Sequence, residues 1–431
     1  MVEMEKIVAL CKNRGFVFPG SELYGGLANT WDYGPLGVEL KNNIKREWWK
    51  FFVRECKNSV GMDGGILMNP QVWVASGHVG GFTDPLVDCK ECKTRARADT
   101  LVDNKCPNCG KSNWTKERVF NLMFKTERGV TEESLNTIYL RPETAQSQFV
   151  NFLNLQRTTR FKLPFGVGQV GKAFRNEITP GNFIFRTVEF DQMEYQLFCE
   201  EKDSMKHYEE YKQKAMKFYT GRLGIKPENL KFVNHDTLAH YAKAAVDAEY
   251  NFPFGWGEVG GTHHRGTFDL GNHKLKYTPE GAEAFTPTVI ESSHGLDRLL
   301  LAVLVDAYEE ESVTDGDVRV VLRLKPSIAP YSVAVLPLQK KNLTEKSHEV
   351  FDKLASCFSV TYDETGSIGK RYRRQDEIGT PLCVTIDYET LEDDTVTIRD
   401  RDTMKQERVK IADLQSKITQ SLYGCNCNPC R

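Results

Sequence analysis

The chain has 431 residues, of which 40% are hydrophobic and 27% are charged, and its formal net charge is -2 at pH 7. This composition is typical of a globular protein with two or three domains, and it excludes a membrane-spanning protein, a secreted protein with a signal peptide and a strongly basic nucleic-acid-binding chain. We therefore expect a cytoplasmic protein in which any contact with nucleic acid comes from local patches of charge.

The first strong element is a predicted helix that begins at Pro35, because proline is favoured in the first helical turn. Its apolar positions recur at four-residue spacing and are Leu36, Leu40, Ile44 and Trp48. Two tryptophans and two phenylalanines between residues 48 and 52 make its far end aromatic. This pattern fits a helix in the core, or a subunit interface, where large aromatic residues are enriched.

Twelve cysteines in a chain without a secretory signal indicate thiols and metal ligands rather than disulfides. Cys89 and Cys92 form one CxxC pair, and after thirteen intervening residues Cys106 and Cys109 form a second. Four thiolates in a small polar segment predict a structural zinc site, in which the metal supplies folding energy. The tail carries a weaker three-ligand pattern at the chain end, for which a metal site is the less favoured interpretation: Cys425, Cys427 and Cys430.

The stretch from residue 172 to residue 195, KAFRNEITPGNFIFRTVEFDQMEY, predicts a hairpin around the turn Thr179-Pro180-Gly181-Asn182. Side chains two residues apart share one face of a strand. One arm would therefore present Arg175 and Glu177, and the other would present Arg186, Val188, Phe190, Gln192 and Glu194. An aromatic ring among cations and carboxylates suits a flat polyanionic ligand, whereas a solvated hairpin with scattered ion pairs is the alternative.

Residues 255 to 260, GWGEVG, fit the GxGxxG pattern, but Trp256 occupies the turn and no apolar strand leads into it. We therefore reject a dinucleotide-binding loop. His263 and His264 are adjacent and would face opposite sides of a strand, so a shared metal ion is not expected. A structural or hydrogen-bonding role is the better interpretation.

A second apolar helix is predicted from Leu296 to about Tyr308, and the composition changes near residue 327. Beyond that boundary the pattern predicts strands at Tyr331 to Leu338, Leu382 to Ile386 and Val396 to Ile398, with a helix from Leu343 to Phe358. This order describes a separate α/β domain of about 100 residues. Two basic patches fit either a solvated face or contact with nucleic acid: residues 370–374 (KRYRR), and Arg157, Arg160 and Lys162.

With these elements in place, the chain resembles the class II aminoacyl-tRNA synthetases over nearly its whole length, and among them the homodimeric glycyl-tRNA synthetases. The first class motif resembles residues 32–37 (DYGPLG), the second the hairpin of residues 174–190, and the third residues 291–298 (ESSHGLDR). The resemblance implies an α+β catalytic domain with a central antiparallel sheet over residues 1–327, with a cysteine-containing insertion at about 84–118. It also implies an anticodon-binding α/β domain over residues 328–424, a tail over residues 425–431, and a homodimer.

The resemblance implies an ATP site in which Arg175, Glu177 and Arg298 are catalytic. Arg175 would hold the α-phosphate, because a preset cation facing the developing charge is the main electrostatic device for such a reaction. Phe190 would stack on adenine, and Arg298, with Arg186, would bind the far phosphates. The full implied set is Arg175, Asn176, Glu177, Phe185, Arg186, Thr187, Val188, Glu189, Phe190, Glu258, Val259, Gly295, Leu296, Asp297 and Arg298.

The resemblance also implies a glycine site, whose ammonium group needs hydrogen-bond acceptors that Glu143, Glu194 and Ser293 would supply. Larger amino acids would be excluded by collision, so no editing domain is needed. Arg265 would order this pocket. The full implied set is Arg97, Glu143, Phe190, Asp191, Gln192, Met193, Glu194, Glu291, Ser292, Ser293, His294 and Gly295.

The implied activity is glycine–tRNA ligation, which consumes ATP and uses Mg²⁺, with Glu291 or Glu189 as candidate metal ligands. Two alternatives stay open from the sequence. One is a catalytically silent, synthetase-like accessory protein that binds nucleic acid, which should lack the motif arginines. The other is a synthetase for a different amino acid, such as proline or threonine.

Overall fold

A seven-stranded sheet forms the centre of the larger, N-terminal part of the computed structural model, which describes residues 2–131, 136–177, 181–235, 243–314 and 316–424. Neighbouring strands are antiparallel except for the edge pair β3–β9, which is parallel. This confirms the predicted α+β class with a central antiparallel sheet. In spatial order the strands are β11 (Leu230–Asn234), β12 (Ala244–Phe252), β13 (Gly255–Gly266), β14 (Thr288–Gly295), β10 (Glu189–Cys199), β9 (Phe165–Phe174) and β3 (Ser59–Gly61).

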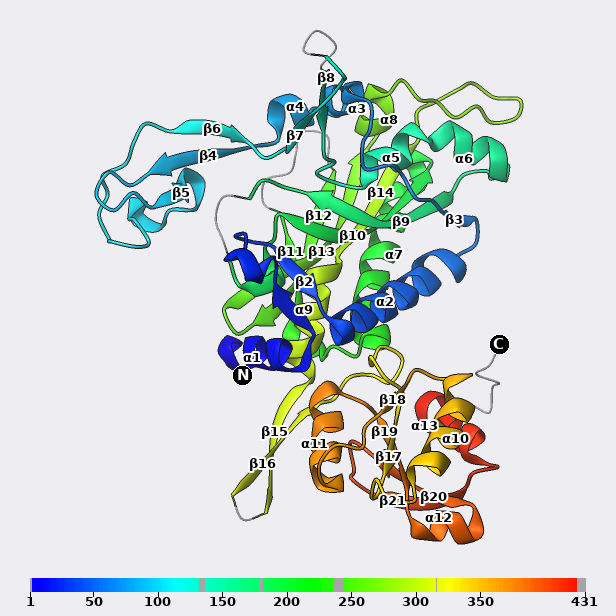
Figure 1. The fold of residues 1–431 in the computed structure, drawn as a ribbon. Helices are drawn as coiled ribbons and strands as arrows, with labels where there is room; N and C mark the ends of the chain where they lie inside the picture. Colours follow the sequence, from blue (N-terminus) through cyan, green and yellow to red (C-terminus); the bar gives the residue numbers. More distant parts are fainter. Residues whose placement is uncertain (1, 132–135, 178–180, 236–242, 315, 425–431) are drawn as a thin grey trace.

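Three helices cover one face of this sheet and form the main core with it (Figure 1). They are α2 (Pro35–Trp49), α7 (Ser204–Lys217) and α9 (Leu296–Ala307). Both predicted apolar helices, at Pro35 and at Leu296, are thus confirmed. The leucines of α9 are fully buried, and each contributes roughly 1.5–3 kcal/mol of hydrophobic free energy.

The aromatic end of α2 packs mainly inside the molecule. Trp48 and Phe52 are fully buried, and their rings stack 5.4 Å apart. The chain continues past Trp49 as a π-helical turn over Lys50–Arg54. The core interpretation of these two residues is therefore the correct one. Large exposed apolar side chains near this helix lie instead at residues 18–38, which include Leu23 and Tyr24.

Shorter elements surround the sheet and complete this part of the chain. The remaining helices are α1 (Met4–Arg14), α3 (Pro70–Ala75), α4 (His78–Gly81), α5 (Ala145–Val150), α6 (Phe152–Thr159) and α8 (Phe268–Asn272). Two small hairpins are formed by β1 (Val17–Pro19) with β2 (Trp31–Tyr33) and by β7 (Lys125–Arg128) with β8 (Asn136–Tyr139). A second apolar cluster packs α5, α6 and α8 against the sheet.

A small three-stranded sheet projects from the side of this body, at the left of Figure 1. Its spatial order is β5 (Arg95–Arg97), β4 (Thr83–Asp88) and β6 (Arg118–Asn121), and it carries the two CxxC pairs. The predicted insertion at about 84–118 falls within these strands.

The C-terminal part has its own sheet and its own apolar core. Its strands, in spatial order, are β18 (Val360–Tyr362), β17 (Val333–Pro337), β19 (Leu382–Ile386), β20 (Thr395–Asp400) and β21 (Gln406–Lys410). Its helices are α10 (Thr344–Ala355), α11 (Ile368–Ile378), α12 (Tyr388–Asp393) and α13 (Leu414–Tyr423). The predicted strands and the predicted helix at Leu343 are present, and their apolar core is separate from that of the N-terminal part.

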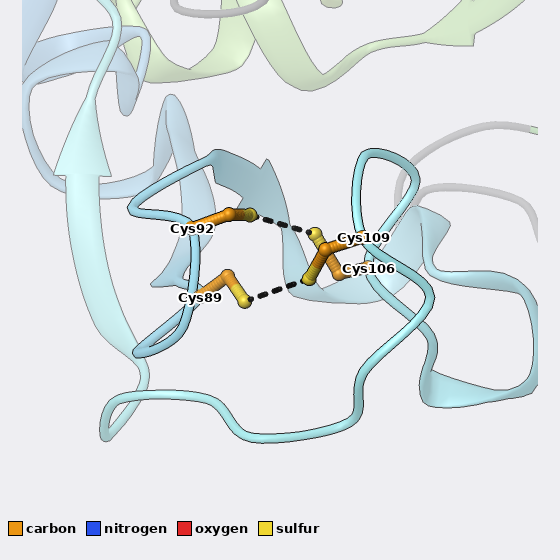
Figure 2. A group of neighbouring side chains, drawn as sticks. All are labelled: Cys89, Cys92, Cys106 and Cys109. Atoms are coloured by element: carbon orange, nitrogen blue, oxygen red, sulfur yellow. Dashed lines mark hydrogen bonds between the residues drawn. The ribbon is translucent and has the colours of Figure 1, made fainter.

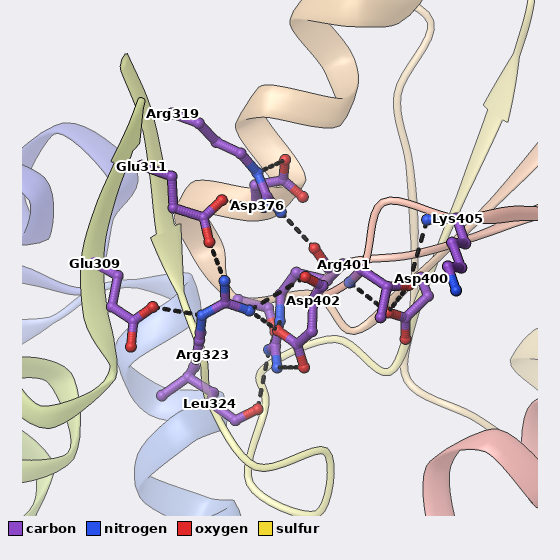
Figure 3. Close-up of polar contacts among 12 residues, drawn as sticks. Glu309, Glu311, Arg319, Arg323, Leu324, Asp376, Asp400, Arg401, Asp402 and Lys405 are labelled. Carbon is purple, nitrogen blue, oxygen red and sulfur yellow. Dashed lines mark hydrogen bonds and ion pairs between the residues drawn. The ribbon is translucent and has the colours of Figure 1, made fainter. Parts of the chain in front are cut away.

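The hairpin β15 (Tyr308–Thr314) and β16 (Asp317–Leu322) joins the two parts. α9 runs directly into β15, and β16 packs on α11 (Figure 1). Arg319 of β16 donates to Asp376 of α11 at 2.8 Å, and both side chains are fully buried. Arg323 bridges Glu309 and Asp402 at 2.5 and 2.8 Å (Figure 3). The hairpin is thus held to the C-terminal part by charged hydrogen bonds as well as by packing.

Candidate active site

Two central strands determine which side chains face the site. β10 and β14 pair in register, so that Glu194 lies opposite Ser293 and Gln192 lies opposite Gly295. Side chains alternate along each strand. Met193 and His294 therefore face the helical core on the other side of the sheet, where both are fully buried.

A first cavity lies where the second and third motifs meet. Its described lining residues are Arg175, Glu177, Ile184, Phe185, Arg186, Thr187, Phe190, Asp191, Gln192, Glu258, Val259, Gly260, Ser293, Gly295, Asp297 and Arg298. Most of the predicted ATP-binding residues are therefore brought together. Phe190 and Arg298, which should hold the base between them, line the same cavity. Two further lining residues, Ile184 and Gly260, were not predicted.

The two key arginines of this cavity are held by the backbone. Arg298 donates from Nε to the Phe185 carbonyl oxygen and from Nη1 to the Glu258 carbonyl oxygen, both at 3.0 Å, and its guanidinium lies 4.4 Å from the centre of the Phe185 ring. Arg175 donates to the Pro142 carbonyl oxygen at 3.1 Å, and its guanidinium lies 5.4 Å from the centre of the Phe190 ring. Both cations are thus oriented in advance of any ligand.

A glycine in strand β13 leaves space for the Phe185 ring, which packs against Arg298. A Cβ atom at Gly257 would lie 2.7 Å from the Phe185 ring, which real structures do not tolerate. The GWGEVG segment that resembles a dinucleotide loop is therefore part of a strand, and its second glycine lets Phe185 pack beneath Arg298. The reasons given for rejecting a dinucleotide-binding loop need correction, because strand β12 does precede the segment and Trp256 lies in β13 rather than in the turn.

A second cavity adjoins the first and is rich in carboxylates. Its described lining residues are Glu143, Arg175, Gln192, Glu194, His235, Ala245, Glu258, Gly261, His263, Arg265, Glu291 and Ser293. The three acceptors predicted for an ammonium group, Glu143, Glu194 and Ser293, share this cavity. Four residues line both cavities: Arg175, Gln192, Glu258 and Ser293.

Arg265 organises the floor of the second cavity. It donates two hydrogen bonds to Asp269, at 2.7 and 3.0 Å, and a third to Glu291 at 2.9 Å. Glu291 also accepts from Gln196 at 2.7 Å. Burial raises the pKa of Glu291, but Arg265 and His263 outweigh burial and lower this pKa to about 2. Glu291 is thus fully ionised, and both of its carboxylate oxygens already have hydrogen-bond partners.

The other two carboxylates of the cavity differ in charge state. Burial, together with the charges of Glu291 and Glu143, raises the pKa of Glu194 to about 8. Burial also acts to raise the pKa of Glu143, but His78 and Arg265 outweigh it and lower this pKa well below its usual range. Before a cation enters, Glu194 is therefore largely protonated at neutral pH, while Glu143 is ionised. A small cation would restore the charge on Glu194.

A buried ion cluster lies behind the first cavity and ties it to helix α2. The ammonium group of Lys41 contacts Asp191 at 2.5 Å and Asp297 at 2.7 Å. Asp297 also accepts from the Asp191 backbone N–H at 2.7 Å and from the Tyr33 hydroxyl. Asp191 and Asp297 were predicted as substrate contacts, but their carboxylates serve this cluster, which joins the first, second and third motifs.

Several predicted substrate residues are not among the described residues that line either cavity. Among those predicted for ATP, Asn176 and Val188 bond through their backbone N–H groups to Leu122 and Asn29, Glu189 pairs with Lys172 at 2.8 Å, and Leu296 is buried in the core. Strand alternation excludes Met193, Ser292 and His294 from the glycine site, because they face the core. Arg97 pairs with Asp84 and Asp99 on the projecting sheet.

The predicted hairpin also needs correction, because its second strand begins only at Glu189. Residues 183–185 form a short 3-10 helix, and Arg175 bonds through its backbone N–H to the Val188 carbonyl oxygen. Strand alternation therefore does not apply between residues 175 and 188. Thr179 and Pro180 of the predicted turn lie outside the described residues.

Three residues that pair with charged side chains of the second cavity were not predicted from the sequence. They are Asp269, which pairs with Arg265, and His235 and Asp247, which lie beside His263. Asp269 lies four residues after Arg265, but Arg265 stands at the end of β13 and Asp269 in α8, so the helical four-residue spacing did not indicate their contact. His235 and Asp247 lie on strands β11 and β12 or beside them, and nothing in their local sequence indicates the contact.

The four cysteines of the projecting sheet converge as predicted (Figure 2). Their sulfur atoms all lie within 4.8 Å of one another, with Cys89 and Cys109 at 3.6 Å and Cys92 and Cys106 at 3.5 Å. Tetrahedral zinc with bonds of about 2.3 Å requires sulfur atoms about 3.8 Å apart, whereas a disulfide requires about 2.0 Å. The cluster therefore fits zinc. The tail cysteines Cys425, Cys427 and Cys430 lie outside the described residues.

Comparison with known proteins defines the class of this fold. Residues 124–307 match the model of the tRNA synthetase class II core domain (G, H, P, S and T), and residues 332–421 match the model of the anticodon binding domain. The sheet and the C-terminal part are thus those of a class II aminoacyl-tRNA synthetase. No helix in the described part of the chain is long and apolar enough to span a membrane.

Similarity to curated proteins then gives the particular family. The chain is 55% identical to the glycine–tRNA ligase of Clostridium kluyveri, over 97% of this chain and 98% of that protein. It is 54% identical to that of Clostridium perfringens over the same shares, and 56% identical to that of Acetivibrio thermocellus over 96% and 97%. The chain belongs to the glycine–tRNA ligase family.

Proposed function

We propose that this chain attaches glycine to its tRNA in two steps at the paired cavities. A carboxylate oxygen of glycine attacks the α-phosphorus of ATP, the bond to the β-phosphate breaks, and pyrophosphate leaves. The 3′-hydroxyl of the terminal adenosine of tRNA(Gly) then attacks the carbonyl carbon of glycyl-adenylate, and AMP leaves. The observation that carries this proposal is that Arg175 lines both cavities, at the point where a nucleotide and an amino acid would meet.

The first cavity suits ATP. Arg175 would stabilise charge on the α-phosphate, since a preoriented cation costs no reorganisation when the reaction occurs. Phe190 and Arg298 supply a ring and a guanidinium plane in one cavity, which suits a flat base. Apposition of the two substrates could supply about 7–11 kcal/mol of the barrier, so no covalent enzyme intermediate is needed.

The second cavity suits the ammonium group of glycine. Glu143, Glu194 and Ser293 offer acceptors for its three N–H donors. Ser293 already donates to Glu194 at 3.2 Å, so the acceptors are close enough to act together. We propose that larger amino acids are excluded by collision with the residues that surround these acceptors.

Two metals are part of the proposal. Mg²⁺ would accompany ATP and neutralise phosphate charge. Of its two predicted ligands, Glu291 already bonds Gln196, His263 and Arg265, and Glu189 pairs with Lys172 outside both cavities, so we assign the ion to neither carboxylate. Zn²⁺ would be held by Cys89, Cys92, Cys106 and Cys109, where it would supply folding energy to the projecting sheet.

We further propose a cytoplasmic homodimer. Leu23, Tyr24 and Leu27 are 87%, 88% and 67% exposed beside the start of α2, and an apolar group of this kind marks an interaction surface. A second copy of the chain is the occupant expected for the region that resembles the first class motif.

The C-terminal part would bind the anticodon arm, although the basic segment at residues 370–374 is less available than its sequence indicates. Arg371 is 2% exposed and donates to the backbone of Pro337 and Gly366. Arg373 pairs with Asp317, and Arg374 pairs with Asp363, both at 2.6 Å. A free basic patch at this position is therefore not expected, and we assign no tRNA contact to Arg371.

Pyrophosphate exchange with each of the twenty amino acids in turn tests the function. We expect exchange with glycine alone. Arg175→Ala should reduce this exchange roughly 100- to 1,000-fold, as expected for loss of one preoriented donor to the transition state. Arg54→Ala, which removes an exposed arginine, is the matched control and should leave exchange unchanged.

Exchange with another amino acid would indicate a synthetase of different specificity. Absence of exchange with all twenty would favour the silent accessory protein. Equal activity of Arg175→Ala and the wild type would contradict the assignment of Arg175 to the α-phosphate.

A further inference from the structure

Three side chains from neighbouring strands converge at the open rim of the second cavity. His235 follows β11, Asp247 lies on β12 and His263 lies on β13, and one ligand atom from each lies within 4.8 Å of the other two. The backbone N–H of His235 donates to the Ala245 carbonyl oxygen, which continues the strand pairing and places His235 beside β12. Two imidazoles and one carboxylate are thus brought together by three consecutive strands.

The orientation of His263 leaves one ring nitrogen facing this group. Nδ1 of His263 lies 2.9 Å from Glu291 Oε1, and Nε2 lies 3.6 Å from Asp247 Oδ1. The second separation is too long for a hydrogen bond but suits two ligands of one ion. A histidine that ligates a metal commonly donates its other N–H to a carboxylate, which fixes its tautomer. Glu291 serves that role here, because Arg265 and Gln196 hold it in place.

A glycine on the same face creates the space into which these atoms project. A Cβ atom at Gly261 would lie 2.7 Å from Nε2 of His263 and 3.2 Å from Oδ1 of Asp247. Any other residue at position 261 would therefore displace the two ligand atoms. The neighbouring His264 is fully buried, and its Nδ1 accepts from the Gly266 backbone N–H, so it takes no part.

We propose that His235, Asp247 and His263 form a binding site for a divalent first-row transition-metal ion, with Zn²⁺ as the first candidate. Two imidazole nitrogens and a carboxylate oxygen suit Zn²⁺ better than Mg²⁺, which prefers oxygen ligands. Three protein ligands leave a fourth position for water or another ligand, and His235 and His263 both line the second cavity, so that position would open toward it. The site is distinct from the four-cysteine cluster.

The competing interpretation uses the same side chains without a metal. His235 lies 2.9 Å from Asp247, and a doubly protonated His263 would hydrogen-bond Glu291 and form an ion pair with Asp247. Such a cluster of charged hydrogen bonds would need no ion. The two interpretations differ in whether the protein binds metal beyond the cysteine cluster.

Zinc stoichiometry on the full chain decides between them. The wild type and the variants His235→Gln and Asp247→Asn are incubated with excess zinc chloride and desalted, and bound zinc is measured by mass spectrometry. We expect one more equivalent of zinc in the wild type than in either variant, with an affinity loss of roughly 10- to 100-fold or more at this site. His235 is exposed, so its replacement should not disturb folding.

His207→Gln is the matched control, because His207 also lies 2.9 Å from a carboxylate, that of Glu210, but belongs to no described group of three ligands. It should bind as much zinc as the wild type. Cobalt substitution adds a second readout: the wild type should bind one more equivalent of cobalt than His235→Gln, while the thiolate charge-transfer band and the visible bands of the cysteine cluster should be the same in both. Equal zinc content in wild type and His235→Gln, or binding confined to the cysteines in all variants, would overturn the proposal.

Discussion

The side chain of Glu194 combines full burial with two neighbouring carboxylates, and this combination raises its pKa to about 8. Thr144 and Ser293 both donate to it, so the group keeps its position in either charge state. A buried acid of this kind is neutral while the site is empty and ionises when a cation binds beside it. It can therefore bind an ammonium group, and the empty site does not bear the free-energy cost of an unpaired buried charge.

The first prediction concerns the pH dependence of glycine binding. Below its pKa of about 8, Glu194 is protonated, and an ammonium group favours the ionised form, so binding releases a proton. The Michaelis constant for glycine in pyrophosphate exchange should therefore fall as pH rises from 6 toward 8, by up to about tenfold per pH unit. Kinetics across this range measure the effect.

Glu194→Gln provides the control for this titration, since an amide cannot ionise. It should bind glycine more weakly, and its Michaelis constant should lose the pH dependence. A flat profile in the wild type would show that the carboxylate is already ionised before glycine enters.

The sequence motifs were enough to select Arg175, Phe190 and Glu143 as site residues. Their charge states and partners were not predictable from these motifs. The ionisation of Glu194 depends on Glu143 and Glu291, which come from elements 51 and 97 residues away along the chain. Such interactions depend on tertiary packing, which no local pattern encodes.

At the scale of elements, helix α2 contributes a charge as well as apolar packing. Lys41→Met should lower the free energy of unfolding by about 3–5 kcal/mol, because it leaves the buried carboxylates of Asp191 and Asp297 without their cation. Urea unfolding followed by tryptophan fluorescence measures this loss.

Lys45→Met is the matched control on the same helix. Lys45 lies 3.8 Å from Asp191 but is 32% exposed, so its loss should cost less than about 1 kcal/mol. Similar losses in the two variants would show that the buried cluster contributes no more than a surface ion pair.

The projecting sheet yields a prediction about metal removal. Its small strands cannot bury a substantial core, so its folding should depend on the cysteine cluster. Treatment with a chelator, or the change Cys92→Ser, should make residues 84–118 sensitive to limited proteolysis while the rest of the chain stays resistant. Cys56→Ser, which alters a half-buried cysteine outside the cluster, should behave like the wild type. Resistance after zinc loss would show that this sheet folds without metal.

Element boundaries were predicted best where one period dominates. The four-residue spacing in α2 and the unbroken apolar run in α9 gave helices close to those observed. The loop between β9 and β10 was extended wrongly as strand, because beyond the bond of Arg175 to Val188 its backbone also bonds to distant segments at Leu122 and Asn29. Long-range backbone bonding of this kind has no signature in local composition.

At the scale of the whole molecule, the exposed apolar residues near α2 predict the oligomeric state. Tyr24→Glu combined with Leu27→Glu should convert a dimer to a monomer, because two charges would be buried on association. Sedimentation equilibrium measures the mass. Met205→Glu, which charges an exposed apolar side chain on α7, is the control and should remain dimeric. An unchanged mass in the double variant would place the interface elsewhere.

The division into two parts was visible in the sequence because the composition changes at the prolines near residue 327. Their connection was not. The hairpin of β15 and β16 was not predicted, and the buried pair of Arg319 with Asp376 joins residues 57 positions apart. Arg319 and Asp376 show that charged residues, which sequence patterns place in solvent, can be fully buried between a hairpin and a helix.

The direct passage of α9 into β15 has a mechanical consequence. Arg298 stands on the first turn of this helix, and the strand at its other end is clamped to the C-terminal part by Arg319 and Arg323. A twelve-residue helix is a stiff rod about 18 Å long. The first cavity and the C-terminal part are therefore connected by one continuous, rigid element of the chain.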